Sequence, residues 1–75
     1  MRDDLRRVLA DVFELSPAEI PDDASTETLA NWDSLRQLEL MLALELDFGV
    51  RLDTETMLEL TSAEAIEAYL EQHRA

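Results

Sequence analysis

Apolar residues recur near the start of the chain at the spacing of an amphipathic helix. The first run follows positions i, i+3, i+4, i+7 and i+8 and comprises Leu5, Val8, Leu9, Val12 and Phe13. Residues at this spacing share one helix face, so the run predicts a helix with a single buried stripe. Asp3 and Asp4 suit the positive N-terminal end of such a helix. The helix is predicted to end within 15–17, because the residue before Pro17 avoids helical geometry.

A second, leucine-rich helix is predicted from about Ser34 to Phe48. Ser34 at the N-cap and Gln37 at the third helical position form the pattern of a capping box. Gly49 is the only glycine of the chain and follows Phe48 directly, where a C′ glycine commonly ends a helix. The start and stop signals of this segment therefore agree.

Residues 16–33 form a long connection between these two helices. The segment from Ser16 to Glu19 fits a capping box with proline at the first helical position, which predicts a short helical turn. Three apolar residues are the expected anchors of the connection to the core: Ile20, Leu29 and Trp32. Loops longer than about 12–15 residues are uncommon in compact domains and are often functional.

Two further helical segments are predicted after the long helix. A short one covers 54–60 with Asp53 or Thr54 as its cap, and 61–64 opens the last helix with another capping box. The inner stripe of the last helix comprises Ala63, Ile66 and Leu70. No segment alternates with a period of two. The sequence therefore predicts an all-α bundle, in which residues 1–75 form one domain with three main helices and a short third helix.

The long helix carries two apolar faces on a helical wheel. One face comprises Leu40, Met41, Leu44 and Phe48, and the roughly opposite face comprises Leu35, Leu38, Leu42 and Leu46. Glu39 and Glu45 border the second face. A surface helix needs only one apolar stripe to pack, so a second stripe is either covered or available for binding. Two interpretations stay open: residues 16–33 bury this face, or it docks partners with basic surfaces.

The chain is strongly acidic, with 18 Asp and Glu residues against six arginines, no lysine and a formal net charge of −12. Such a surface repels nucleic-acid phosphate and anionic lipid and attracts basic partner surfaces, so we expect no binding to nucleic acid or membranes. The alternative is that the acidity only keeps a small protein soluble. The sequence shows no signal peptide and no membrane span, which predicts a cytoplasmic protein, and we expect a monomer.

Few residues of the chain are suited to catalysis. Without cysteine there is no thiol nucleophile and no disulfide. Asp22, Asp23 and Asp33 lack the alternating spacing and central glycine of a calcium loop, so no metal site is expected. His73, the only histidine, is expected to complement the dipole of the last helix. Ser34 has no histidine or lysine near it in sequence to activate it, so we do not expect an enzyme.

Ser34, taken alone in the tripeptide Asp-Ser-Leu, is an ordinary helix cap. The whole chain, however, resembles the carrier-protein family, which includes acyl carrier proteins and the related peptidyl and D-alanyl carriers. The resemblance is carried by Trp32-Asp33-Ser34-Leu35, by the run from Leu38 to Phe48, and by Thr61-Ser62, Ile66 and Tyr69-Leu70. It covers essentially all 75 residues, including the helix lengths and the long first connection.

This resemblance implies the family's four-helix bundle, with 4′-phosphopantetheine attached covalently to the hydroxyl of Ser34. A phosphopantetheinyl transferase would add the group from coenzyme A with the help of magnesium. Its thiol would hold acyl or aminoacyl groups as thioesters, received from a loading enzyme and passed to downstream acyl-transferring enzymes. The positions that the family uses in partner recognition match Asp33, Leu35, Leu38, Glu39, Leu42 and Glu45. The resemblance therefore favours the docking interpretation of the second apolar face.

Two features differ from the usual pattern of fatty-acid carriers. Asn31 and Trp32 stand where those carriers usually have Gly-Ala. The segment Glu27-Thr28-Leu29 followed by Trp32-Asp33-Ser34-Leu35 looks more like discrete carriers of specialised pathways. Such pathways include polyketide, nonribosomal peptide, glyceryl-type and polysaccharide-modifying systems. Arg36 takes a position that is often acidic or apolar, and it can pair with Glu39 or change partner choice. The competing hypothesis is an acidic helical adaptor that docks partners without a covalent cofactor.

Overall fold

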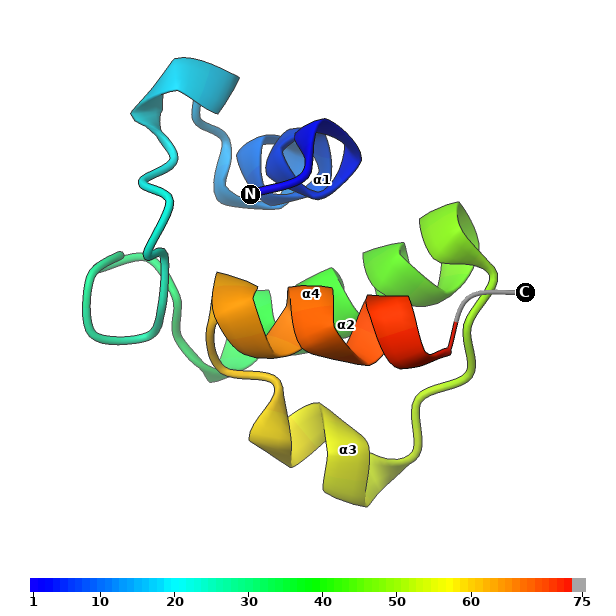
Figure 1. The fold of residues 1–75 in the computed structure, drawn as a ribbon. Coiled ribbons are helices and arrows are strands. Elements are labelled where there is room, and N and C mark those ends of the chain that lie inside the picture. Colours follow the sequence, from blue (N-terminus) through cyan, green and yellow to red (C-terminus); the bar gives the residue numbers. More distant parts are fainter. Residues whose placement is uncertain (74–75) are drawn as a thin grey trace.

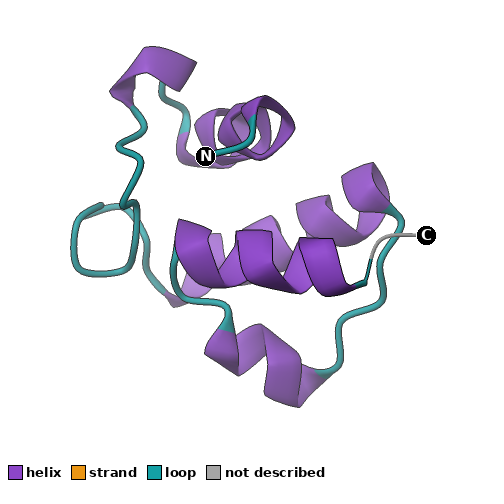
Figure 2. Ribbon diagram, viewed as in Figure 1, coloured by secondary structure: helices purple, strands orange, loops and turns teal. Residues whose placement is uncertain are grey.

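Within residues 1–73, which a computed structural model describes, the chain forms helices and no strand (Figures 1 and 2). The elements are α1 (Asp3–Phe13), the short 3-10 helix η1 (Pro17–Glu19), α2 (Ser34–Phe48), α3 (Thr54–Glu59) and α4 (Ala63–Gln72). In Figure 1, α4 lies in front of α2, with α1 above this pair and α3 below it. The predicted all-α bundle with three main helices and a short third helix is therefore confirmed.

The core is formed by the predicted inner stripes of the three main helices. Its largest buried side chains are Phe13, Leu5, Leu9, Ile20, Leu40, Met41, Leu44 and Ile66. The apolar stripe of α1 and the first apolar face of α2 are thus confirmed as core, although Val12 and Phe48 are only half-buried. Burying a side chain of this size stabilises a fold by about 1.5–3 kcal/mol relative to exposure. No helix within the described residues is long and apolar enough to span a membrane.

Residues 16–33 reach this core through their expected anchors. Ile20 and Trp32 are buried, and Leu29 is half-buried against the core. The ring of Trp32 packs on that of Phe13, with the two centroids 5.3 Å apart. The end of the long connection is thus held against α1.

The ends of α2 and α3 lie close to their predicted positions. Gly49 follows α2 with a φ of 66°, in the left-handed region where glycine is favoured. Asp53, one of the two candidate caps, accepts a hydrogen bond at the start of α3. By contrast, α1 ends at Phe13 and not within 15–17, because Glu14 takes a left-handed conformation with a φ of 57°.

The two remaining capping boxes have different outcomes. At η1 the box is confirmed, since the carboxylate of Glu19 accepts the backbone N–H of Ser16 at 3.0 Å. At α4 the prediction is displaced by one residue, because the cap is Ser62 and not Thr61. The hydroxyl of Ser62 accepts the N–H of Ala65 at 3.1 Å.

Arg36 joins the start of α2 to the end of α1. Its guanidinium donates to the carbonyl oxygen of Val12 and to the carboxylate of Glu14, each at 2.9 Å. The predicted contact with Glu39 is also present, at the longer distance of 3.6 Å. Arg36 is therefore chiefly a contact between two main helices.

We expect Arg36→Met to lower the free energy of unfolding by about 1–2 kcal/mol, because it removes charge-assisted bonds but keeps a long apolar stem. Urea unfolding followed by circular dichroism measures the change. Arg51→Met is the matched control, since the exposed Arg51 side chain has no partner among residues 1–73. Equal losses in the two variants would contradict the role given to Arg36.

We also expect part of the stability to be lost in acid through Asp53. Hydrogen bonds from Thr56, first its side chain and then its backbone N–H, hold the pKa of Asp53 below its usual value. The stabilisation is therefore complete above the unfolded pKa of about 3.9 and is lost as the pH falls through the lower folded pKa. Urea midpoints at neutral and acid pH should differ less in Asp53→Asn than in the wild type. Asp11→Asn serves as the control, and an unchanged pH dependence in Asp53→Asn would refute the assignment.

Candidate functional site

The start of α2 is capped by Asp33 and not by Ser34. The side chain of Asp33 accepts the backbone N–H of Arg36 at 3.0 Å, and its backbone is extended as in an N-cap residue. Ser34 is therefore the first helical residue, and the predicted capping box of Ser34 and Gln37 is wrong. Aspartate and serine are about equally good N-caps, so two such residues in a row leave the start of the helix ambiguous by one position.

This arrangement leaves the hydroxyl of Ser34 free. Ser34 is exposed, and its hydroxyl has no hydrogen-bond partner among residues 1–73. The backbone N–H groups of Ser34 and Leu35 also lack an acceptor within residues 1–73, since Asp33 accepts the N–H groups of Arg36 and Gln37 instead. Free N–H groups and the helix dipole favour a phosphate at this end by about 0.3–1 kcal/mol. The hydroxyl can thus be esterified by a phosphate group without loss of the helix cap.

Gln37 points away from the helix cap and joins three parts of the molecule. Its amide oxygen accepts the indole N–H of Trp32 at 2.6 Å. Its amide nitrogen donates to the carbonyl oxygens of Met57 at 2.7 Å and Leu60 at 3.0 Å. Three partly buried hydrogen bonds outweigh one exposed bond to the cap, which explains why the capping box does not form. Gln37 therefore fixes the loop before Ser34 to the end of α3.

A short backbone bridge joins the same loop to the start of α4. Ser25 and Ser62 pair as an isolated antiparallel bridge. Beside them, the N–H of Thr26 donates to the carbonyl oxygen of Thr61 at 3.1 Å. The connection between α3 and α4 is thus bonded to the loop at this bridge and, through Gln37, at Trp32.

A groove of about 270 Å³ opens beside Ser34. Its lining residues come from the loop, the start of α2 and the connection before α4: Thr26, Trp32, Asp33, Ser34, Gln37 and Thr61. We call it the Ser34 groove. The lining offers hydroxyl groups, an amide and carbon surface, with Asp33 as its one charged residue.

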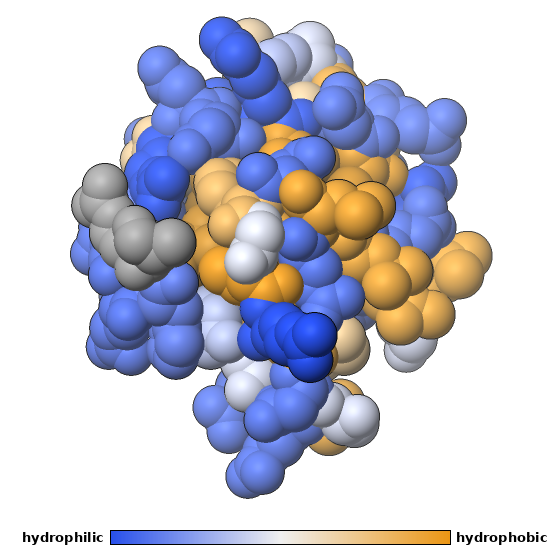
Figure 3. All heavy atoms as spheres, turned by 90° about the vertical axis from the view of Figure 1, so that its right-hand side faces the viewer, coloured by the Kyte–Doolittle hydropathy of each residue, from blue (hydrophilic) through white to orange (hydrophobic). Residues whose placement is uncertain are grey.

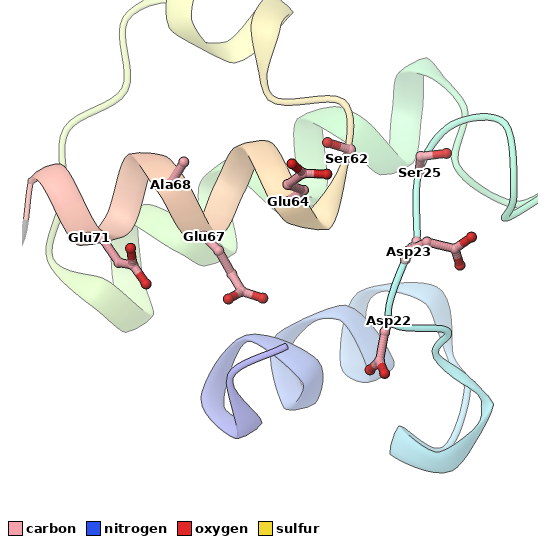
Figure 4. A pocket seen from close by; sticks show the side chains of 9 residues that line it. Asp22, Asp23, Ser25, Ser62, Glu64, Glu67, Ala68 and Glu71 are labelled. Carbon is pink, nitrogen blue, oxygen red and sulfur yellow. The ribbon is translucent and has the colours of Figure 1, made fainter.

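A larger hollow of about 640 Å³ lies between the loop and α4 and shares no lining residue with the Ser34 groove. Figure 4 shows the side chain of Glu67 projecting below α4, whereas those of Asp22 and Asp23 point away from that helix. The N-terminal ammonium of Met1 lies 3.7 Å from the carboxylate of Glu67. The lining holds five carboxylates, which repel a phosphate group. Within residues 1–73, no three His, Asp or Glu side chains are placed to hold a metal ion.

The second apolar face of α2 is exposed. Its exposed fractions are 64, 52, 50 and 84% for Leu35, Leu38, Leu42 and Leu46, which we call the leucine face. The interpretation that residues 16–33 bury this face is therefore wrong, because the buried anchors Ile20 and Trp32 hold the loop in the core instead. Figure 3 shows one side of the surface, on which apolar side chains gather beside hydrophilic ones.

The two glutamates that border the leucine face differ in their contacts. Glu39 is exposed and lies 3.6 Å from Arg36. Glu45 is half-buried and accepts the N–H of Leu52 at 2.9 Å, so it also holds the chain that follows α2. Glu39 therefore has the freer carboxylate of the two.

One exposed leucine was not among the residues that the sequence singled out. Leu58 of α3 is 74% exposed, whereas Leu60 is buried and Met57 is half-buried. Three large apolar residues within four positions of a short helix exceed the width of one buried stripe. That excess is the signal that could have identified Leu58.

Comparison with known proteins agrees with this geometry. Residues 3–70 match the family described as the phosphopantetheine attachment site. The chain is 39% identical over 61 residues to the polyketide-8 synthase acyl carrier protein 2 of Streptomyces avermitilis, an alignment that covers 81% of this chain and 70% of that protein.

These matches confirm the resemblance drawn from the sequence and do not favour an adaptor without a covalent cofactor. Members of the family carry covalent 4′-phosphopantetheine and interact with a phosphopantetheinyl transferase and with the enzymes of their pathway. The free serine at the start of α2, the exposed leucine face and the match over residues 3–70 lead to one conclusion. The chain belongs to the phosphopantetheine-bearing carrier proteins.

Proposed function

We propose that Ser34 carries the 4′-phosphopantetheine group and that the chain works as an acyl or aminoacyl carrier. The observation that supports this most directly is the exposed, unbonded hydroxyl of Ser34 at the first turn of α2, where Asp33 supplies the cap. The family match over residues 3–70 supports treating residues 1–75 as one carrier domain. The carrier is then a substrate of its partner enzymes and not a catalyst.

In the loading step, the Ser34 oxygen forms a bond to the phosphorus that bears the pantetheine arm of coenzyme A. The bond from that phosphorus to the adenosine bisphosphate breaks, and the hydroxyl proton passes to a base. The histidine of this chain does not suit that role, since His73 ends α4, contacts the carbonyl oxygen of Tyr69 at 2.9 Å and stacks on its ring. The base and the magnesium would therefore belong to the transferase. Once attached, the group supplies the thiol that a chain without cysteine lacks.

The proposed docking surface runs along α2 from the attachment site. It comprises Asp33, Leu35, Leu38, Glu39, Leu42 and Glu45. Its apolar members are at least half exposed, and its carboxylates belong to a chain with a net charge of −12. Such a surface steers basic patches of a transferase, a loading enzyme or a downstream acyl-transferring enzyme toward Ser34. Weak, fast contacts suit a carrier that has to leave each partner in turn.

The relative from Streptomyces avermitilis is by name a polyketide synthase carrier. This supports a specialised pathway for the present chain, with polyketide assembly favoured among the alternatives considered above. Loading from coenzyme A implies the cytoplasm, and the proposed carrier would act as a monomer.

Ser34→Ala should abolish loading. The purified protein is incubated with coenzyme A, magnesium and a broad-specificity phosphopantetheinyl transferase, and its intact mass is then measured. We expect one added phosphopantetheine on the wild type and none on Ser34→Ala, because the attacking oxygen is gone. Ser16→Ala, which changes another exposed serine before a helical turn, should load like the wild type. An unmodified wild type, or a modified Ser34→Ala, would disprove the assignment.

Glu39→Lys should slow partner association several-fold and flatten its dependence on salt, because it reverses a charge on the docking surface. Stopped-flow binding to the transferase over a range of salt concentrations measures both effects. Glu71→Lys makes the same charge change on an exposed position of α4 and should have a smaller effect. Equal slowing by both substitutions would show that net charge alone, and not this surface, steers the partner.

A further inference from the structure

We propose that the proximal part of the phosphopantetheine arm lies in the Ser34 groove, against Trp32 and between the hydroxyls of Thr26 and Thr61. This rests on the attachment at Ser34 proposed above, and it assigns the part of the surface where this chain holds its arm.

The groove begins at the attachment atom itself. Ser34 is one of its lining residues, so a group esterified to the hydroxyl enters the groove without spanning other surface. A short tether gives an effective concentration in the millimolar range, at which even weak contacts are populated. The groove, at about 270 Å³, is below the roughly 300–1,000 Å³ of pockets that enclose whole small ligands. It therefore suits the part of the arm next to the phosphate and leaves the thiol end outside.

The chemistry of the lining matches that part of the arm. Next to its phosphate the arm has a branched hydrocarbon, a hydroxyl and an amide. Thr26 and Thr61 are exposed, and their hydroxyls have no partner among residues 1–73. The 3.1 Å backbone bond between these two residues holds them side by side. The two hydroxyls can accept from and donate to the amide, while the small exposed edge of the otherwise buried Trp32 borders the branched hydrocarbon.

The hydrogen bonds of Gln37 favour an arm in the Ser34 groove over an arm that runs between the helices. Both hydrogens of its amide nitrogen are taken by Met57 and Leu60, so they are not available to the arm. The same bonds span from α2 to the end of α3 beside the groove. An arm in the Ser34 groove therefore lies beside the loop residues Thr26 and Trp32, and the bonds of Gln37 separate it from the space between α2 and α3.

Comparison of the unloaded and loaded protein by nuclear magnetic resonance tests the proposal, with intact mass confirming loading of the same sample. We expect shifts of the indole N–H of Trp32 and of the amides of Thr26 and Thr61. Nuclear Overhauser contacts should join the geminal methyls of the arm to the methyls of both threonines. Shifts confined to Ser34 and its chain neighbours would overturn the proposal, as would contacts of the arm with the leucine face or between α2 and α3.

Thr61→Val provides a matched test, because it removes a hydroxyl but keeps the shape and the backbone bond. We expect the change in Trp32 fluorescence on loading, which reports from the only tryptophan of the chain, to be reduced in Thr61→Val. Thr54→Val, an exposed threonine outside the groove, should retain the wild-type change. An unchanged response in Thr61→Val would refute the role of its hydroxyl. If the wild type loads but shows no groove contacts, only this inference fails; if it does not load, the attachment at Ser34 fails as well.

Discussion

The side chain of Gln37 holds together the parts of the molecule that surround Ser34. The six-residue helix α3 has no buried side chain of its own and is far shorter than the roughly 12–15 residues at which isolated helices become marginal. Its position therefore depends on tertiary bonds, and Gln37 supplies two of them at its end. Through Trp32, which packs on Phe13, the same amide connects α3 to α1. Ser34 lies within this frame, one helical turn before Gln37.

If the arm is attached at Ser34 as proposed, the charges around this residue favour its presentation over tight binding. The free N–H groups at the start of α2 attract a phosphodiester, but the carboxylate that caps the same helix repels it. Exposed interactions of this kind are each on the order of 1 kcal/mol or less and largely offset each other. An arm attached at Ser34 as proposed would then be held by weak contacts with neutral groups, which a partner enzyme can replace. The acidic surface would act at longer range, by steering basic partners to the proposed docking surface on α2.

Local sequence signals were sufficient for the helices and for their buried faces. The bounds of α2 agree with its leucine pattern and with Gly49, and the anchors Ile20 and Trp32 follow from isolated apolar residues in a polar loop. The proposal of Ser34 as the attachment site depends on the family resemblance, because a helix cap alone carries little information. These features depend on spacing within one segment or on a motif.

The features that the sequence did not predict depend on contacts between distant segments. Asp33 and Ser34 are equivalent as local caps. Asp33 is the cap in the structure because Gln37 bonds to residues 20 and 23 positions further along the chain and not to the start of its own helix. Arg36 similarly finds its main partners 22 and 24 residues back, in the end of α1. A helical wheel shows a second apolar face but not the course of the loop. The exposure of the leucine face could therefore be established only from the tertiary structure.

Ser34 is presented from a rigid corner of the fold and not from a mobile loop, because the hydrogen bonds of Gln37 hold the loop before it. Backbone and indole ¹⁵N relaxation of the unloaded protein tests it most directly. We predict order parameters of about 0.85, as in rigid backbone, for the amide of Ser34 and for the indole N–H of Trp32. Values below about 0.6 at these two groups would contradict the account, because the hydrogen bonds of Gln37 would then not hold the site.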